Sequence, residues 1–412
     1  MACLAPELRF DGYTDAWEQR ELDELASFGG GHTPSMADDS NYLDGEILWV
    51  TSQDVKVDYL EDTTTKLSAK GASELKLYPE GTLLMVTRSG ILRHTLPVSM
   101  LRKPSTVNQD IRTISTFDEC SSLWLMQYLK ARSKQLLLEY GKTGTTVESI
   151  DFAKMKSMPL MLPGLDEQKA VGSLFYQLDN LITLHQREYD KLVTTKQAML
   201  QKMFPKPGED VPEVRFDGFE GSWARPKLKN VSCRVTRKNE GNKSDRPLTI
   251  SAEFGLVDQL EYYKSQVASR DMSGYYLIEN GEFAYNKSTS DGAPFGAVKR
   301  LDRYDKGALS TLYIAFSLND TIDSDYAVAY FMTDCWHPEI VMRAAEGARS
   351  HGLLNISPDD FFDIDISMPE SIREQQAIGL FFTNLDQLIS LKSQELVKLK
   401  QVKSALLQKM FV

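Results

Sequence analysis

The 412-residue sequence contains few of the side chains that bind metals or form disulfides. It has only four cysteines, which stand far apart with no paired spacing: Cys3, Cys120, Cys233 and Cys335. Its five histidines are equally scattered. A zinc site, a disulfide framework and a histidine-based triad therefore have no support in the sequence. We expect a protein of the reducing cytoplasm.

Long apolar segments are also missing. No run of apolar residues approaches about 18, the length that a helix needs to span a membrane. No N-terminal stretch combines a basic start with an apolar core. We therefore expect neither secretion nor insertion into a membrane.

The motifs of nucleotide-dependent catalysis are absent as well. The sequence has no Gly-x-x-x-x-Gly-Lys phosphate loop, no Gly-x-Gly-x-x-Gly fingerprint after a strand, and no Asn/Asp-Pro-Pro-aromatic signature of adenine methyltransferases. Acidic pairs occur, but nothing sets one apart as a general acid or base. The sequence predicts a chain that binds and positions other molecules, with no catalytic residue, metal or cofactor of its own.

The net charge of −11 argues against a non-specific coat for nucleic acid. It does not exclude DNA binding, because the local field decides that interaction. Residues 225–246 form a local basic stretch with eight lysines and arginines and only two acidic residues. A solvated charged surface explains this stretch equally well, so both interpretations stay open.

An internal repeat is the most informative feature that the sequence does contain. Pro-Glu-Leu-Arg-Phe-Asp-Gly-Tyr at residues 6–13 returns as Pro-Glu-Val-Arg-Phe-Asp-Gly-Phe at 212–219, and Trp17 and Trp223 follow at the same offset. Glu-Gln-Lys-Ala-Val-Gly at 167–172 and Leu-Gln-Lys-Met-Phe at 200–204 return near 374–379 and at 407–411. Between these matches the halves hardly agree. A shared frame with two divergent inserts predicts two different recognition domains on one scaffold.

Residues 165–204 and 372–411 are predicted to form long helices. Apolar residues recur there in steps of three and four, a narrow stripe typical of a coiled coil. About 38 residues at ~1.5 Å each give roughly 57 Å per helix. Neither helix could bury its stripe alone, and we expect the two to pair in antiparallel fashion and the chain ends to meet. The residues expected to pair are Leu178, Ile182 and Leu192 in the first helix and Leu385, Ile389 and Leu399 in the second.

The inserts combine short β-type runs with about one helix each, which predicts two small α+β domains. The fold class expected is therefore α+β, with two globular domains joined by two long antiparallel coiled-coil helices and a pseudo-twofold repeat. The predicted segments are domain 1 at 1–163, helix 1 at 164–204, a proline-rich linker at 205–211, domain 2 at 212–369 and helix 2 at 370–412.

Polar loops of the inserts carry groups that suit DNA. Arginine fits guanine, asparagine and glutamine fit adenine, and lysine, serine and threonine can hold phosphates. The candidates are Thr51, Ser52, Gln53, Arg88, Ser89, Arg93, His94, Asn108 and Gln109 in the first insert, and Asn286, Lys287, Ser288, Thr289, Arg300, Arg349, Ser350 and His351 in the second. For any single residue, a solvated polar loop is an equally good explanation. Tyr262 and Tyr263 are expected to pack rather than to stack on bases.

The frame strongly resembles the specificity subunits of bacterial type I restriction–modification systems. The resemblance rests on the two Pro-Glu-[Leu/Val]-Arg-Phe-Asp-Gly openings, each with its tryptophan, on the Glu-Gln start of both helices, and on both Leu-Gln-Lys-Met-Phe ends. Residues 347–356, Gly-Ala-Arg-Ser-His-Gly-Leu-Leu-Asn-Ile, look like the end of a target-recognition domain in that family, and residues 141–150 match more loosely.

This resemblance implies two target-recognition domains, each contacting one half of a split double-stranded DNA site, with the helices as a ruler between them. It also implies two modification subunits that methylate adenines with S-adenosylmethionine, and possibly two restriction subunits that use ATP and magnesium. The DNA-contacting residues themselves are not implied, because the inserts diverge within the family.

Two other classes stay open from the residues alone. One is a coiled-coil adaptor that joins proteins without touching DNA. The other is an enzyme whose site the sequence does not reveal.

Overall fold

The chain is described here from a computed structural model, which covers residues 6–144, 147–251, 254–264, 268–269, 271–290, 292–344 and 354–411. It divides into two compact units. Unit 1 comprises Met1–Arg187 and Ser393–Val412, and unit 2 comprises Glu188–Lys392. The borders fall inside the two long helices, so each helix contributes to both units.

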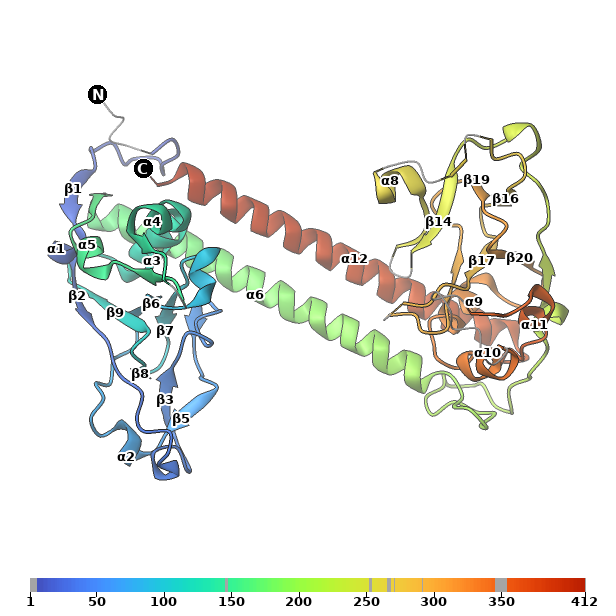
Figure 1. Ribbon diagram of the computed structural model, residues 1–412, viewed down its shortest axis with the longest axis horizontal. Helices are drawn as coiled ribbons and strands as arrows, with labels where there is room; N and C mark the ends of the chain where they lie inside the picture. Colours follow the sequence, from blue (N-terminus) through green and yellow to red (C-terminus); the bar gives the residue numbers. More distant parts are fainter. Residues whose placement is uncertain are drawn as a thin grey trace. The chain divides into compact units, whose positions relative to one another are not determined.

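The two long helices are α6 (Leu165–Lys202) and α12 (Ile372–Lys409), of 38 residues each. Within each unit they lie side by side (Figure 1). Of the residues predicted to pair, Leu385 is buried and the other five are half-buried: Leu178, Ile182, Leu192, Ile389 and Leu399. Among the described residues, neither these helices nor any other is apolar enough over a sufficient length to cross a membrane.

Ion pairs between the helices show that they run antiparallel. In unit 1, His185 Nδ1 of α6 lies 3.1 Å from Glu395 Oε2 of α12. In unit 2, Lys392 Nζ of α12 lies 3.0 Å from Glu188 Oε2 of α6. His185 and Lys392 are equivalent in the repeat. Each of these two polar residues pairs with an acidic residue of the other long helix.

The globular part of unit 1 contains two larger sheets, besides the two-stranded sheets β1-β12 and β10-β11. The first has the strand order β2-β9-β6-β7-β4 and the second β5-β3-β8. The strands are β2 (Ala26–Gly29), β3 (Ile47–Val50), β4 (Tyr59–Leu60), β5 (Thr65–Leu67), β6 (Leu83–Val86), β7 (Val98–Leu101), β8 (Thr106–Val107) and β9 (Ile111–Thr116). Helices α3 (Ser122–Ala131) and α4 (Ser133–Tyr140) pack on the core beside α6. Shorter elements are β1 (Glu18–Glu21), β10 (Gly141–Lys142), β11 (Ser149–Ile150), β12 (Pro159–Leu162), α1 (Leu22–Leu25), α2 (Ala69–Ala72), α5 (Phe152–Lys156), η1 (Asp39–Asn41) and η2 (Gly90–Arg93).

The globular part of unit 2 repeats this architecture. Its sheets have the orders β13-β20-β17-β18 and β15-β14-β19-β16. The strands are β13 (Ser232–Arg234), β14 (Pro247–Ser251), β15 (Gly255–Asp258), β16 (Tyr276–Glu279), β17 (Phe283–Asn286), β18 (Ala297–Arg300), β19 (Lys306–Leu309) and β20 (Ile314–Leu318). The helices are α7 (Leu228–Val231), α8 (Gln259–Tyr263), α9 (Ser324–Tyr330), α10 (His337–Arg343) and α11 (Pro358–Phe362), with η3 (Glu240–Asn242).

The two inserts therefore share one fold although their sequences hardly agree. In both units a central strand (β6 or β17) pairs antiparallel with its neighbours, and β3 and β14 each have one parallel neighbour, β8 and β19. The fifth strand β4 of unit 1 has no counterpart in the described sheets of unit 2. The predicted fold class, two α+β domains joined by paired antiparallel helices in an internal repeat, is confirmed.

The repeated glutamines hold each globular part on its long helix. In unit 1, Gln168 is buried, accepts the Ser121 N–H at 2.8 Å and donates to the carbonyl oxygens of Pro163 (2.8 Å) and Glu119 (3.1 Å). Ser121 is also the N-cap residue of α3. The side chain thus satisfies backbone groups that burial at a helix start would otherwise leave unpaired.

Gln375 repeats this arrangement in unit 2. It accepts the N–H of Asp323, the N-cap residue of α9, at 2.7 Å, and donates to the carbonyl oxygens of Pro369 (2.9 Å) and Thr321 (3.4 Å). The repeated glycines have a matching explanation. A Cβ on Gly172 would lie 2.8 Å from Leu123 Cβ, and a Cβ on Gly379 would lie 2.7 Å from the Asp325 Cβ, so α3 and α9 approach the long helices closely.

The opening motif of each half is held on the start of a long helix by an ion pair. Arg9 forms a bidentate pair with Glu167 (2.7 and 2.8 Å), and Arg215 does so with Glu374 (2.7 and 2.8 Å). Planar guanidinium–carboxylate pairs of this kind fix orientation as well as distance. The Leu8 N–H donates to the Lys409 carbonyl at 2.9 Å, so the opening motif and the final helix meet in unit 1 as the repeat predicts.

Candidate nucleic-acid interface

Three of the sequence-predicted loops meet at one edge of unit 1. The N–H of Asn108, after β8, donates to the carbonyl of Val50 at the end of β3 (2.9 Å). The N–H of Thr87, after β6, donates to the carbonyl of Asp110 (2.8 Å). The ends of β3, β6 and β8 thus bring residues 51–53, 87–89 and 108–110 together, and we call these residues the polar edge of unit 1.

Side chains of the polar edge differ in their availability. Asn108 is buried, and its Oδ1 accepts the Asp110 N–H at 3.0 Å, so this side chain shapes the turn. Thr51 Oγ1 donates to Asp54 Oδ2 at 2.8 Å and is likewise part of a turn. Ser52 is half-buried, whereas Gln53 and Arg88 are exposed. Gln109 is exposed as well, but its amide group contacts Thr33 and Asp110, so Gln53 and Arg88 are the more available side chains of this group.

The structure adds a loop that the sequence analysis missed. Thr33 Oγ1 donates to Gln109 Oε1 at 2.7 Å, which places residues 29–33 beside the polar edge. A Cβ on Gly31 would lie 1.8 Å from the Val107 carbonyl, so only glycine allows this approach. The run of three glycines at 29–31 was the available signal, since consecutive glycines mark close backbone contacts.

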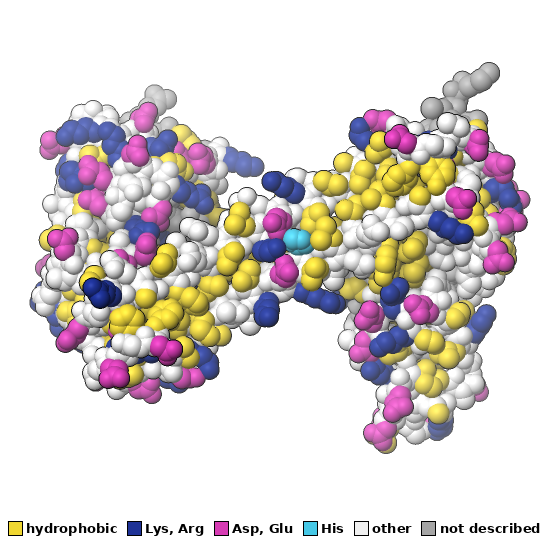
Figure 2. Space-filling view, turned by 180° about the vertical axis from the view of Figure 1, so that it is seen from behind, with side chains coloured by type: hydrophobic (Ala, Val, Ile, Leu, Met, Phe, Trp, Pro, Cys, Tyr) yellow, Lys and Arg dark blue, Asp and Glu magenta, His cyan; other side chains and the backbone are white. Residues whose placement is uncertain are grey.

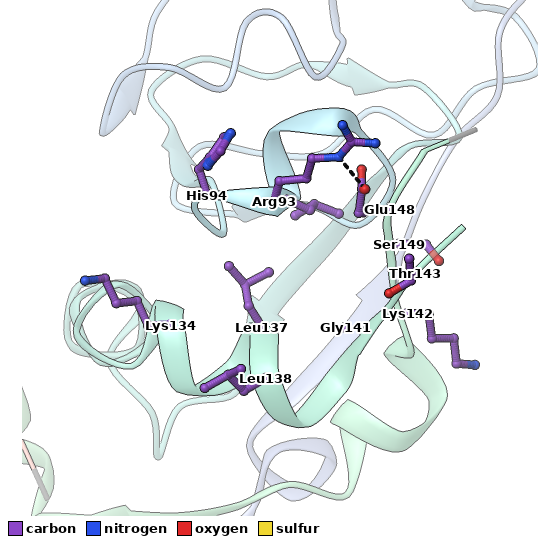
Figure 3. Close-up of a pocket in the computed structure, with 11 residues that line it drawn as sticks. Arg93, His94, Lys134, Leu137, Leu138, Gly141, Lys142, Thr143, Glu148 and Ser149 are labelled. Atoms are coloured by element: carbon purple, nitrogen blue, oxygen red, sulfur yellow. Dashed lines mark hydrogen bonds and ion pairs between the residues drawn. The ribbon is translucent and has the colours of Figure 1, made fainter. Parts of the chain in front are cut away.

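Ser89, Arg93 and His94 lead from the polar edge to a cavity of about 750 Å³. Ser89 is the N-cap residue of η2, and its hydroxyl accepts the Ile91 N–H at 3.4 Å. Figure 3 shows Arg93 and Glu148 pointing toward one another at one side of the cavity, with Arg93 Nε and Glu148 Oε1 2.5 Å apart. This hydrogen bond lowers the pKa of the Glu148 carboxyl.

Basic and apolar side chains line the rest of this cavity. Lys134, Leu137 and Leu138 come from α4, and Lys142 comes from β10 (Figure 3). Lys142 is paired with Asp151 at 2.7 Å. The cavity is thus a basic hollow beside the polar edge, of a size and charge that suit a phosphate-bearing ligand.

Unit 2 has an equivalent edge at the end of β17. Asn286 Oδ1 accepts the Ser288 N–H at 3.0 Å, which stabilises the turn after the strand. The Lys287 carbonyl accepts the Leu354 N–H at 3.0 Å, and Lys287 Nζ donates to the Ile356 carbonyl at 3.5 Å. Ser288 is exposed and Thr289 is half-buried. We call residues 286–289, together with the ends of β14 and β19, the edge of unit 2.

Arg300 lies apart from this edge. It pairs with Phe283 at the opposite end of β17. Its guanidinium lies 2.6 Å from Asp302 Oδ1, in the loop after β18, and 2.8 Å from Asp325 Oδ1 of α9. The structure therefore separates Arg300 from Asn286, Lys287, Ser288 and Thr289. The remaining candidates of the second insert, Arg349, Ser350 and His351, lie outside the described residues.

A largely buried ionic network joins the insert of unit 1 to both long helices. Asp58 pairs with Lys130 of α3 and with Lys403 of α12 (3.0 Å), and Lys403 also pairs with Asp179 of α6. Burial alone would raise the pKa of Asp58, but Lys130 and Lys403 outweigh it and lower that pKa. Two carboxylates and two ammonium groups thus balance one another.

The corresponding network of unit 2 is incomplete. Lys196 and Asp386, the repeat equivalents of Lys403 and Asp179, pair at 2.5 Å. The second ammonium group comes from Lys299 of β18, and no second carboxylate joins it among the described residues. Burial lowers the pKa of Lys299, and the positive charge of Lys196 lowers it further. The negative charge of Asp386 raises this pKa, but by less. Two half-buried lysines of unit 2 thus face a single carboxylate.

The long helices also expose apolar side chains at equivalent positions. In unit 1 these are Leu181 and Leu184, and in unit 2 they are Leu388 and Leu391. On the face in Figure 2, acidic and basic side chains are interspersed over each unit rather than gathered by sign. In the part of the chain that the structure describes, no cluster of His, Cys, Asp or Glu could hold a metal ion.

Comparison with known structures shows a protein that shares this fold. The S subunit of a type I restriction-modification system from M. genitalium, known from a crystal structure, superposes with a TM-score of 0.64 at 14% identity. The superposition covers 99% of each chain. At this identity the likeness shows a shared fold.

Sequence comparison finds similarity in part of the chain. Residues 14–194 match the type I restriction modification DNA specificity domain. The type I restriction enzyme EcoR124I/EcoR124II specificity subunit of Escherichia coli is 29% identical over 204 residues, which cover 46% of this chain and 49% of that subunit. The MjaIX specificity subunit of Methanocaldococcus jannaschii is 25% identical over 171 residues, 40% of this chain and 38% of that subunit. The chain thus matches about half or less of these relatives' length. Over the matched residues it is similar to type I restriction–modification specificity subunits, the family that its repeated motifs resemble.

Proposed function

We propose that this chain is the DNA-binding specificity subunit of a type I restriction–modification complex and that each unit reads one half of a split double-stranded DNA site. The observation that supports this proposal most is that the two units share one fold, whereas the polar edge of unit 1 and the edge of unit 2 carry different side chains. The frame residues and the strand order agree between the units, whereas the side chains at the ends of β3, β6 and β8 differ from those at β14, β17 and β19. A repeated scaffold with divergent edges suits two independent readings.

The polar edge of unit 1 supplies suitable chemistry. Arg88 is exposed and can donate two hydrogen bonds to guanine, and Gln53 can pair with adenine. Ser89 and the basic cavity near Arg93 suit the phosphates that fix the register of the protein on DNA. Because acidic residues are interspersed over the surface, we expect weak binding by the chain alone and strong binding in a complex.

Two modification subunits are the proposed partners, one for each unit. The support is the repeated apolar pair, Leu181 with Leu184 and Leu388 with Leu391, because exposed apolar side chains at equivalent sites suit two copies of one partner. The modification subunits would methylate an adenine in each half-site with S-adenosylmethionine. Restriction subunits would add ATP- and magnesium-dependent cleavage. The chain itself would act in the cytoplasm, hold no cofactor and contribute no catalytic residue.

The test is a map of methylated adenines made by the chain together with its modification subunit. We expect methylation at a split sequence, and Arg88→Ala should relax or weaken recognition in one half only. Lys103→Ala is the matched control, because this exposed cation follows β7, whose end lies away from the polar edge. Normal assembly with the modification subunit but no sequence preference in methylation would support a coiled-coil adaptor instead. Methylation or cleavage of DNA by the purified chain alone would make it an enzyme.

A further inference from the structure

The edge of unit 2 carries exposed apolar side chains where unit 1 carries polar ones. Phe254, Leu260, Tyr262 and Tyr263 are each 44–49% exposed, and Leu312 is 76% exposed. We call these five residues the apolar patch. Single exposed apolar residues are common on proteins, but a contiguous group of this size marks a site of interaction. Tyr262 and Tyr263, which the sequence analysis expected to be packing residues, remain half-exposed.

Strand register places this patch on the edge of unit 2. Tyr285 at the end of β17 pairs with Ile314 at the start of β20, so the preceding loop with Leu312 lies beside Asn286. Strand β14 runs parallel to β19, and Thr249 Oγ1 of β14 lies 3.1 Å from the hydroxyl of Tyr313. The ends of β14, β17 and β19 therefore share one edge, as the ends of β3, β6 and β8 do in unit 1.

Aromatic contacts join Phe254, Tyr262 and Tyr263 to this edge, and Leu260 lies on the same short helix as the two tyrosines. Phe254 follows β14, and its N–H donates to Ser251 Oγ at 3.1 Å. Its ring centroid lies 6.4 Å from that of Tyr262, and Tyr262 lies 4.8 Å from Tyr263, both in edge-to-face geometry. Helix α8, which carries both tyrosines, lies beside β14 (Figure 1). The rings thus support one another and still present large faces to solvent.

The charges around α8 leave a cation at the rim of the patch. Glu261 accepts a hydrogen bond from the Tyr304 hydroxyl at 3.1 Å, and Asp258 pairs with Arg246 at 3.4 Å. Lys264, directly after Tyr263, is exposed and has no ion-pair partner among the described residues. The patch is thus apolar, with a lysine that has no ion pair at its rim and with both nearby acidic residues bound to other side chains. Such a surface suits a ligand that has apolar groups beside phosphates.

We infer that unit 2 reads its half-site largely through the methyl groups of thymine in the major groove, with the apolar patch as the contacting surface and Lys264 on a neighbouring phosphate. The inference rests on the proposed function of unit 2 as a reader of DNA. Among the bases, only thymine presents an apolar group in the major groove, and apolar side chains recognise it by excluding water from it. Each half-site with a methylated adenine also contains a thymine opposite that adenine.

Deoxyuridine tests this inference, because it removes the thymine methyl and keeps the hydrogen-bonding groups. We would measure binding of the assembled complex to duplexes in which single thymines of one half-site are replaced by deoxyuridine. In the half-site read by unit 2, we expect about three- to fourfold weaker binding for each contacted methyl that is removed. Leu312→Ala should weaken binding to thymine DNA and make the complex less sensitive to deoxyuridine at one position. Met342→Ala, another exposed apolar residue of unit 2, is the control and should change neither.

Three outcomes would overturn the inference. Tolerance of deoxyuridine throughout that half-site would show that no methyl is read. Equal sensitivity of Leu312→Ala and the unchanged chain would show that another surface reads it. Unchanged DNA binding by Leu312→Ala and Tyr262→Ala, with weaker assembly with the modification subunit, would make the patch a protein interface. A complex without sequence preference in either half-site would instead refute the proposed function.

Discussion

The two units of this chain share a frame and a strand order, but they differ in how each insert is held and in what its edge presents. The frame contacts of Gln168 and Gln375 correspond atom for atom, and so do the pairs of Arg9 and Arg215 with their glutamates. The edges, in contrast, are polar in unit 1 and partly apolar in unit 2. Residues that position the inserts are therefore repeated, and residues of the proposed DNA-reading edges are not.

The buried charges show a second difference between the units. In unit 1, Asp58 and Asp179 balance Lys130 and Lys403, whereas in unit 2 only Asp386 faces Lys196 and Lys299. Buried charges are tolerated when they are paired and are costly when they are not. Substitution of equivalent frame residues should therefore lower the free energy of unfolding of the two units equally. Replacement of a network lysine should instead destabilise unit 1 and leave unit 2 unchanged or more stable.

The largest effect is expected for the frame glutamines. Gln168→Ala and Gln375→Ala each remove three hydrogen bonds at buried backbone groups, and each should cost about 3 kcal/mol. The two losses should be equal within about 1 kcal/mol, since the partners correspond. Hydrogen exchange resolved by residue would measure the opening of each unit separately. A loss confined to one unit would show that the frame is not equivalent in the two.

Lys130→Met should destabilise unit 1 by about 2 kcal/mol. This is less than the loss for a fully buried pair, because Asp58 keeps Lys403 as a partner. Hydrogen exchange of residues in α3 and β4 would report the change. Lys134→Met, an exposed lysine of the neighbouring helix α4, serves as the control and should have little effect. Stability equal to that of the unchanged chain would contradict a structural role for this network.

A smaller effect is expected on the partner surfaces. Leu181→Ser with Leu184→Ser, and Leu388→Ser with Leu391→Ser, should each remove one of two bound modification subunits. Either pair alone should leave complexes with a single modification subunit, which native mass spectrometry would detect. Loss of both copies from one substituted pair would contradict two equivalent sites, and retention of both copies would place the interface elsewhere.

The smallest effect, with the opposite sign, is expected for Lys299→Met. Because the pKa of Lys299 is lowered in the folded chain, the unfolded chain binds its proton more tightly. The stability of unit 2 should therefore rise with pH between that lowered pKa and the ordinary value for lysine. Lys299→Met should be neutral or stabilising by up to about 1 kcal/mol at neutral pH and should remove this slope. Urea unfolding of both chains at several alkaline pH values would show whether the slopes differ.

Local patterns made much of the fold predictable. The helices follow from apolar spacing, and their antiparallel pairing follows from the repeat, since each helix must serve both halves. The equivalence of the inserts was not predictable, because strand order depends on contacts between distant residues such as Val50 with Asn108. No local sequence pattern records such contacts when the side chains themselves diverge.

The candidate interface was predictable only in part for the same reason. Residue type suggested Arg88 and Gln53, which are exposed at the polar edge, but it suggested Asn108 and Arg300 equally. Asn108 is buried in its own turn, and Arg300 is bound by two aspartates at the other end of its strand. Residue type gives the chemistry that a side chain can perform, whereas tertiary contacts decide whether that chemistry is available.

An exchange of the second insert tests the independence of the two units most directly. Residues 212–369 would be replaced by the corresponding insert of another family member, and methylated adenines would be mapped across the genome of a cell that carries the hybrid chain and the modification subunit. We predict that one half of the methylated sequence changes and that the other half stays as it was. A change in both halves would contradict separate reading by two units on a common frame.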